Sequence, residues 1–218
     1  TKMFSAVPTN GRTDPVLEEE RPAPYGTEHL GLQINVESIG QARRLTLHFP
    51  CPPSEQYFLE SPTGVILSLI KDQSKGSLFS ILKEKGWAES LSTQYWRGGD
   101  DFKLLSIDIE LTEDGLKNKD AVLEYFFHYV RLMSNTDLKR YFEEKKQIAQ
   151  LDFRYLEPEE PLDTVLMASL LLQYFPTKHV VDFPLVYGDY NEELLRMYLS
   201  KVVPSNMQAI LLAPNVET

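Results

Sequence analysis

Alternation of apolar and polar residues predicts strands at both ends of the chain and in its middle. Residues 32–36 and 45–49 each place an apolar side chain at every second position, which is the period of a half-buried strand. We expect these two strands to be neighbours. Further strands are expected at 89–96 and 102–111, joined by the hairpin-forming Arg97-Gly98-Gly99-Asp100, and at 207–213.

Apolar residues three and four apart predict helices in two blocks. The first block covers 61–70 and 77–85, with Ser61 and Ser77 as expected N-caps and Gly86 as the stop. The second block begins at Thr112, a third expected N-cap, and covers 112–133, 136–155, 162–174, 178–183 and 191–203. Residues 162–174 are apolar on most sides, so we expect this helix to be buried.

Apart from the short helix at 178–183, the order of elements is β-β-α-α-β-β-α-α-α-α-β. Paired strands followed by a block of helices indicate the α+β class. We expect a two-layer domain, with a mostly antiparallel sheet and helices packed on one face. Residues 1–30 are rich in proline, glycine and charge without periodicity and are expected to be a linker or surface arm. Residues 31–218 are expected to form a single domain.

Charge and composition exclude several functions. Asp and Glu outnumber Lys and Arg by 32 to 22, giving a net charge of −10, so no nucleic-acid partner is expected. No apolar run is long enough to span a membrane, and no membrane partner is expected. The single cysteine, Cys51, cannot form an internal disulfide and leaves the cellular compartment open.

The residues that carry chemistry form no catalytic motif. None of the four histidines lies four residues from another, as paired zinc ligands on a helix would. The nearest approach is Tyr25-Gly26-Thr27-Glu28-His29, which has tyrosine where a first ligand should stand and lies in a loop. Serine-nucleophile and phosphate-loop motifs are also absent from the sequence. We therefore expect no catalytic residue and no metal site in this chain.

Five phrases, in this order, resemble the second domain of the pitrilysin and insulin-degrading-enzyme family of inverted-zincin metallopeptidases. They are "LTLHFPCPP" (45–53), "GSLFSILKEKGW" (76–87), "IDIELTEDGL" (107–116), "LDFRY" (151–155) and "VVPSNMQAILLAP" (202–214). The resemblance covers most of the chain. It implies a repeat domain like those of processing peptidase, in a protein that encloses a degradation chamber with four such domains.

In that family only the first domain carries the zinc motif. The resemblance therefore implies a non-catalytic domain of a zinc metalloendopeptidase, with no cofactor in this chain and zinc in the parent protein's first domain. The chain alone is expected to be inactive. The alternative that stays open is a structural or interaction domain from a family member that has lost catalysis. An independent hydrolase using carboxylates or a Ser/His pair is the third possibility.

The resemblance also implies a peptide site. Insulin-degrading members of the family bind the N-terminal part of a peptide as an extra strand, just after a Lys-Gly-Trp phrase, which here is Lys85-Gly86-Trp87. The site then falls at Leu91, Ser92 and Thr93. Glycines and histidines that accompany this site in relatives are replaced here by residues that include Ser68, Lys71, Thr93 and Gln94.

The same resemblance implies the partners. They are the other domains of the same polypeptide and peptide substrates, and a homodimer of the isolated chain is compatible with an exposed docking face. Localisation stays undecided, since a bacterial parent protease would be periplasmic or secreted and a cytoplasmic location also stays open.

Overall fold

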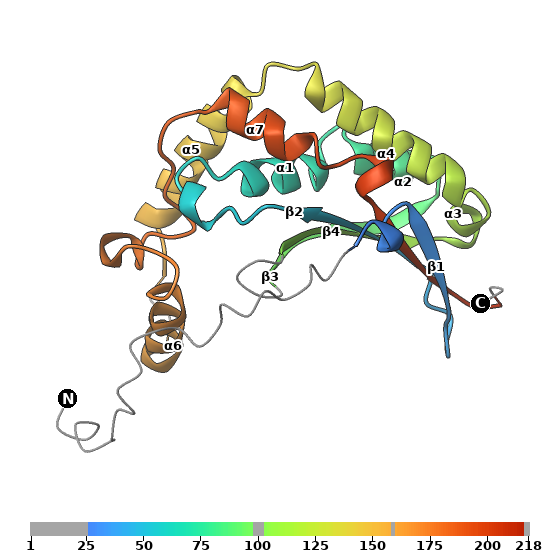
Figure 1. Ribbon diagram of the computed structural model, residues 1–218, viewed down its shortest axis with the longest axis horizontal. Coiled ribbons are helices and arrows are strands. Elements are labelled where there is room, and N and C mark those ends of the chain that lie inside the picture. Colours follow the sequence, from blue (N-terminus) through green and yellow to red (C-terminus); the bar gives the residue numbers. More distant parts are fainter. Residues whose placement is uncertain (1–25, 98–102, 158–159, 216–218) are drawn as a thin grey trace.

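The structure is a computed structural model that describes residues 26–97, 103–157 and 160–215. Most of the expected arm at 1–30 and most of the expected hairpin turn at 97–100 lie outside these residues. Within them the chain forms two layers, a sheet and a layer of helices above it (Figure 1). The expected α+β architecture is confirmed.

The sheet has five strands in the order β1-β5-β2-β4-β3. The strands are β1 (Leu32–Glu37), β2 (Arg44–Cys51), β3 (Ala88–Arg97), β4 (Lys103–Leu111) and β5 (Gln208–Ala213). β2 pairs antiparallel with β4 and β5, and β3 pairs antiparallel with β4. Only β1 and β5 run parallel within the described residues. The sheet is therefore mostly antiparallel, with β1 and β3 as its edges.

The helices follow the predicted blocks. They are α1 (Pro62–Ile70), α2 (Leu78–Glu84), α3 (Glu113–Lys117), α4 (Lys119–Ser134), α5 (Lys139–Arg154), α6 (Pro161–Leu171) and α7 (Glu192–Leu199). Short 3₁₀ helices cover Thr27–His29, Glu55–Tyr57, Thr177–His179 and Pro204–Asn206. The helix expected at 178–183 is thus reduced to a 3₁₀ turn. Figure 1 shows α1, α2, α4 and α7 over the same face of the sheet.

The core lies between the sheet and these helices. Leu45, Leu47 and Phe49 of β2 are completely buried, and so are Val122 and Phe126 of α4. The Phe49 and Phe126 rings stack with their centroids 5.8 Å apart. Each such side chain stabilises the fold by about 1.5–3 kcal/mol through burial. The alternating pattern that predicted β2 is therefore the pattern of its contact with the helices.

The expectation that the first two strands are neighbours is wrong. β5 lies between β1 and β2, and it pairs with β1 through Ile34 and Ile210 and with β2 through Thr46 and Ile210. An internal position suits β5, because Ala209, Leu211 and Ala213 are buried while Ile210 and Leu212 on the other face are partly buried. A pattern local to residues 32–49 contains no information about a strand formed more than 150 residues later.

The N-cap predictions are confirmed at two of three positions. Ser77 and Thr112 accept hydrogen bonds from the backbone N–H groups of Ser80 and Gly115, as N-caps do. Ser61 makes no such bond and has left-handed backbone angles (φ 43°, ψ 50°). These angles lie outside the extended region that an N-cap residue normally adopts, so the Ser61-Pro62 pair marks the helix start without forming the cap.

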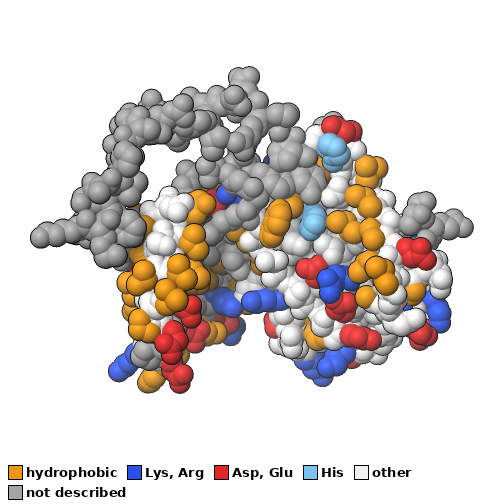
Figure 2. Space-filling view, turned by 90° about the horizontal axis from the view of Figure 1, so that it is seen from below, with side chains coloured by type: hydrophobic (Ala, Val, Ile, Leu, Met, Phe, Trp, Pro, Cys, Tyr) orange, Lys and Arg blue, Asp and Glu red, His pale blue; other side chains and the backbone are white. Residues whose placement is uncertain are grey.

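The helix expected to be buried at 162–174 is exposed. In α6 only Leu171 is buried, whereas the side chains of Leu162 and Val165 are 69% and 64% exposed. Figure 1 shows α6 standing away from the helices that cover the sheet, and Figure 2 shows hydrophobic side chains gathered on it. Ala168 and Leu171 near the end of α6 pack in a small cluster with Phe58 and Phe183, and the other large apolar side chains of this helix are exposed.

Candidate functional site

The predicted peptide site lies on β3, an edge strand of the sheet. All three predicted residues fall within this strand, and their side chains alternate between the two faces. Leu91 is buried beneath the helices, Ser92 is exposed on the helix-free face, and Thr93 is partly buried. The structure therefore brings Leu91, Ser92 and Thr93 together as a continuous stretch of edge backbone.

Side chains on the inward face of β3 attach the strand to the rest of the domain. The Thr93 hydroxyl donates a hydrogen bond to the Leu67 carbonyl oxygen of α1 (3.2 Å). The Tyr95 hydroxyl accepts one from the backbone N–H of Ser54 (3.2 Å), and burial raises the pKa of Tyr95 to about 12. The backbone of β3 is thus held in place before any ligand arrives.

The Lys85-Gly86-Trp87 phrase forms the junction that leads into β3. Gly86 follows α2 with φ of +71°, and the Trp87 N–H donates to the Leu82 carbonyl oxygen, which completes a helix-terminating motif. The Trp87 carbonyl oxygen accepts from the Thr112 N–H, and a Cβ on Gly115 would lie 1.8 Å from that oxygen. The backbones at Trp87 and Gly115 approach so closely that no side chain fits at position 115. This contact joins the phrase that ends at Trp87 to the phrase at 107–116.

Trp87 itself is a packing residue. It is partly buried and its ring meets Tyr125 of α4 edge to face, with centroids 5.8 Å apart. The Lys85 ammonium lies 4.9 Å from the centroids of both rings. The phrase therefore fixes the direction in which β3 leaves α2.

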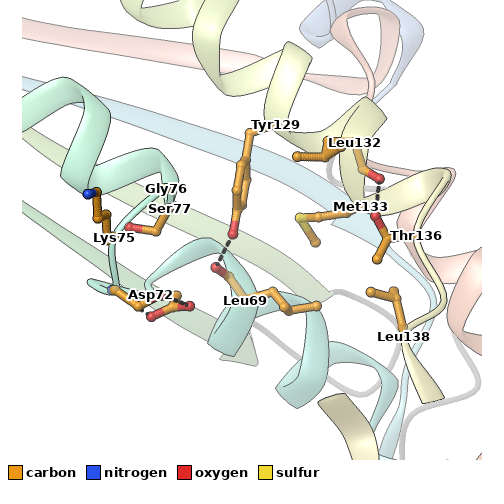
Figure 3. A pocket seen from close by; sticks show the side chains of 11 residues that line it. Leu69, Asp72, Lys75, Gly76, Ser77, Tyr129, Leu132, Met133, Thr136 and Leu138 are labelled. Atoms are coloured by element: carbon orange, nitrogen blue, oxygen red, sulfur yellow. Dashed lines mark hydrogen bonds between the residues drawn. The ribbon is translucent and has the colours of Figure 1, made fainter. Parts of the chain in front are cut away.

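A small pocket lies between the α1–α2 connection and the end of α4 (Figure 3). It has a volume of about 260 Å³, and Leu69, Leu132, Met133 and Leu138 give it apolar walls. The Tyr129 hydroxyl points across it and donates to the Leu69 carbonyl oxygen (3.1 Å). Burial raises the pKa of Tyr129 to about 12, so this hydroxyl stays protonated at neutral pH.

The titratable residues do not form a catalytic arrangement in the described part of the chain. Cys51 is buried, and burial raises the pKa of its thiol to about 12, far from that of a reactive thiolate. Burial also lowers the pKa of His48, which keeps its ring neutral. His179 Nδ1 lies 3.0 Å from the Asp182 carboxylate, in a helical turn with no nucleophile described beside it.

The described residues form no metal-ligand set either. The described residues contain no group of three or more His, Cys, Asp or Glu side chains placed to hold a metal ion. The Nδ1 atom of His29, the last residue of the Tyr25–His29 pattern, accepts a hydrogen bond from the Gly26 N–H, and Tyr25 lies outside the described residues. These residues do not fit zinc. A search of the described helices also finds none long and apolar enough to cross a membrane.

One group of side chains was not predicted as a site. Ser68 and Lys71 of the α1 side line a groove together with Tyr141 and Lys145 of α5. No sequence signal links these pairs, since Ser68 and Tyr141 are 73 residues apart.

Family comparison assigns the chain in two parts. Residues 1–148 match the peptidase M16 inactive domain, and residues 153–218 match the middle or third domain of peptidase M16. Insulin-degrading enzyme of Drosophila melanogaster is 26% identical over 89% of this chain, and the A-factor-processing enzyme of Saccharomyces cerevisiae is 28% identical over 99%. The match spans only 20% and 21% of the lengths of these two proteins.

Solved structures agree on the fold. Pitrilysin superposes with a TM-score of 0.82 at 23% identity, over 92% of this chain and 22% of pitrilysin. A peptidase M16 inactive domain from Pseudomonas fluorescens gives a TM-score of 0.58 at 16% identity, over 85% of this chain and 44% of that one. The predicted resemblance is confirmed. The chain belongs to the M16 peptidase family of pitrilysin and insulin-degrading enzyme, as a non-catalytic part of it.

Proposed function

We propose that this chain is a wall of the degradation chamber of a zinc metalloendopeptidase and anchors peptides by strand addition along β3. The observation that carries the proposal is the position of Leu91, Ser92 and Thr93 on an edge strand in a chain of this family. An edge strand presents unpaired backbone N–H and C=O groups, which an extended peptide can pair with whatever its side chains. This chemistry suits a protease that acts on varied peptides.

Rigid attachment of β3 supports the proposal energetically. Each backbone hydrogen bond contributes about 1 kcal/mol net, so a few such bonds give only weak binding. If β3 were mobile, the entropy lost on ordering it would cancel this binding free energy. The Thr93 and Tyr95 hydrogen bonds hold β3 in an extended form before binding. The ordering cost then falls mainly on the peptide.

The test is peptide binding to the purified chain, measured by fluorescence anisotropy with unrelated extended peptides. Consecutive N–H groups of a strand point to opposite sides. Of the two variants Ser92→Pro and Thr93→Pro, one therefore removes a donor from the β3–β4 pairing and the other, the edge variant, removes a donor from the open edge. The edge variant should stay folded and bind about fivefold more weakly, as expected for the loss of about 1 kcal/mol.

Ser92→Ala is the matched control. It removes a side chain and keeps the N–H, so binding by the backbone should be unchanged. Binding that falls in Ser92→Ala and persists in both folded proline variants would contradict strand addition.

A second function, that of a structural domain in an inactive family member, is favoured by one observation. Thr93 is branched at Cβ and its hydroxyl is already bonded to α1, where peptide-binding relatives are expected to have glycine. An intact H-x-x-E-H motif in the whole protein would favour the peptidase and place zinc in its first domain. A degraded motif would favour the structural domain.

The partners we infer are the other domains of the same polypeptide. Large hydrophobic side chains of α6 are exposed, as expected of a surface that another domain covers. A homodimer of the isolated chain is the competing outcome. Analytical ultracentrifugation distinguishes the two, because the sedimentation coefficient of a dimerising chain rises with its concentration and that of a monomer does not.

We also infer that residues 31–218 behave as one domain, although two family models meet near residue 150. The supporting feature is β5, which belongs to the second matched segment and pairs with β1 and β2 of the first. A chain ending at residue 150 should therefore fail to unfold cooperatively in urea, whereas the full chain should show a single transition. Two independent transitions in the full chain would contradict a single domain.

A further inference from the structure

A groove of about 530 Å³ runs between the end of α1 and α5. We call it the lysine groove. Ser68, Lys71 and Asp72 line it from the α1 side, and Tyr141, Glu144 and Lys145 line it from α5. Two positive and two negative side chains share this surface, so its chemistry depends on which of them already have partners.

The carboxylates of the lysine groove are already engaged. Asp72 accepts hydrogen bonds from the N–H and the hydroxyl of Ser74, at 2.9 and 2.8 Å. Glu144 forms an ion pair with Arg140 one turn earlier in α5 (3.1 Å). Both carboxylates therefore have partners within their own segments.

The two lysines of the groove differ from these carboxylates. Within the described part of the chain neither Lys71 nor Lys145 forms an ion pair at 4.0 Å or less. Burial lowers the pKa of Lys145, and the nearby charge of Lys71 lowers it further, while Asp72 and Asp152 act in the opposite direction. Two ammonium groups that destabilise one another favour an anion between them.

A hydroxyl pair adds a neutral hydrogen-bond donor. Ser68 Oγ and Tyr141 Oη lie 2.9 Å apart, and one of them donates to the other. The accepting hydroxyl keeps its own hydrogen for a further partner. Burial raises the pKa of Tyr141, so its hydroxyl is neutral. The groove therefore offers two ammonium groups and one O–H group to a ligand that can only accept.

The lysine groove adjoins the predicted peptide edge. The Leu67 carbonyl oxygen, which accepts from Thr93 of β3, belongs to the residue just before Ser68. Tyr95 lies by the start of α1, since its hydroxyl accepts from Ser54, whose Oγ is 3.1 Å from Thr63 Oγ1. A peptide that extends along β3 from Thr93 toward Leu91 therefore runs toward the end of α1, where Lys71 begins the groove wall.

We propose that the lysine groove binds a carboxylate of an extended peptide, so that this chain selects acidic peptides at the end of the β3 edge. The selection rests on the proposed function, since the peptide reaches the groove by lying on β3. The carboxylate comes from a Glu or Asp side chain or from the peptide's C-terminus. In a chain of net charge −10, general attraction does not explain a preference for acidic peptides.

The experiment compares three peptides of twelve residues with the same extended sequence. The first carries two Glu residues and capped ends, the second carries Gln in their place, and the third is the Gln peptide with a free C-terminus. Anisotropy should show the Glu peptide or the free C-terminus binding at least tenfold more tightly than the capped Gln peptide, and whichever is tighter identifies the source of the carboxylate.

The decisive variant is Lys71→Ala combined with Lys145→Ala. Its matched control is Lys83→Ala combined with Lys178→Ala, which changes net charge equally at distant positions. The preference should disappear in the first variant and persist in the second. Equal loss in both, or no preference in the unsubstituted chain, would overturn the proposal.

A short probe separates this result from strand addition. N-acetyl-Glu-Glu-amide is too short to add as a strand, so a shift of the Lys145 Nζ signal by NMR reports on the groove alone. If the capped Gln peptide does not bind, strand addition has failed, and a probe-induced shift still supports the groove. No shift in the unsubstituted chain, or tighter binding of inorganic phosphate than of the probe, would overturn the carboxylate assignment.

Discussion

The two edge strands of the sheet are held in opposite ways. On β3 Leu91 faces the helices and is only 6% exposed, whereas Trp96 near the strand's end lies on the other face and is 52% exposed. On β1 the apolar residues face the helix-free side, where Leu32, Ile34 and Val36 are 48%, 43% and 40% exposed. The strand register shows this reversal. Ile34 of β1 is paired across the sheet with Ile210, and Ile210 with Thr46, so these three lie on one face. Thr46 is paired with Asp108 and Asp108 with Ser92, so the exposed Ser92 of β3 lies on the same face as Ile34.

The comparison separates backbone pairing from burial. Both strands pair with one neighbour, yet only β3 adds buried side chains and a hydrogen bond to a helix. An edge suited to binding must stay extended while one side is unpaired, and buried side chains provide that rigidity. β3 meets this requirement and β1 does not.

The largest expected effect comes from Leu91→Ala in β3, compared with Ile34→Ala in β1. Loss of the buried Leu91 side chain should lower the free energy of unfolding by about 3 kcal/mol, because transfer and cavity costs add. Ile34 is 43% exposed, so its truncation should cost much less. Urea unfolding monitored by circular dichroism measures both, and equal costs would show that the two edges are held alike.

The next effect tests the junction that leads into β3. Gly115→Ala places a Cβ against the Trp87 carbonyl oxygen and should cost about 2 kcal/mol, as overpacking against backbone does. Gly40→Ala, with nothing within 4 Å of the added Cβ, is the control and should be nearly neutral. A neutral Gly115→Ala in thermal unfolding would mean that the junction does not fix β3.

A smaller effect is expected from Thr93→Val, which keeps the shape of the side chain and removes its hydroxyl. The lost hydrogen bond should cost about 1 kcal/mol, since the Leu67 carbonyl oxygen still accepts from the Lys71 N–H. Hydrogen exchange of β3 amides should accelerate in this variant. Unchanged exchange would indicate that the bond to α1 does not rigidify the edge.

The smallest effect concerns pH and lies midway between the two edges, at His48 of β2. Burial lowers the pKa of His48 in the folded chain below its ordinary value of about 6.5. As pH falls below that value the unfolded chain binds the proton first, so stability is lost until the folded-state pKa is passed. His48→Gln should give a shallower decline in unfolding free energy between pH 7 and 5, and an unchanged slope would contradict it.

Local sequence patterns predicted the elements well because periodicity depends on neighbouring residues. Alternation at 45–49 predicted β2 to within two residues, and the caps at Ser77 and Thr112 predicted where α2 and α3 begin. The single helix expected at 112–133 is divided into α3 and α4. Alternation does not say which side of a strand is covered, and β1 shows the consequence. The neighbour of β1 depends on β5, which no pattern near residue 32 can indicate.

The candidate site was predicted only in part for the same reason. The family phrase ending at Trp87 located β3, and its edge position followed from the resemblance. The lysine groove required the approach of α1 and α5, which is set by packing between distant segments. The exposure of α6 was also beyond prediction, since an apolar composition does not reveal whether its covering surface belongs to the same stretch of chain.

The place of β5 has a consequence for how the protein is made. β2 lies between β4 and β5, so one side of it stays unpaired with its final neighbour until residues 208–213 leave the ribosome. That is about 160 residues after β2 itself, or roughly 8–30 s at 5–20 residues per second. During this interval the nascent chain exposes an apolar strand edge of the kind that chaperones protect. The rate of synthesis therefore sets how long this edge stays exposed before the sheet can be completed.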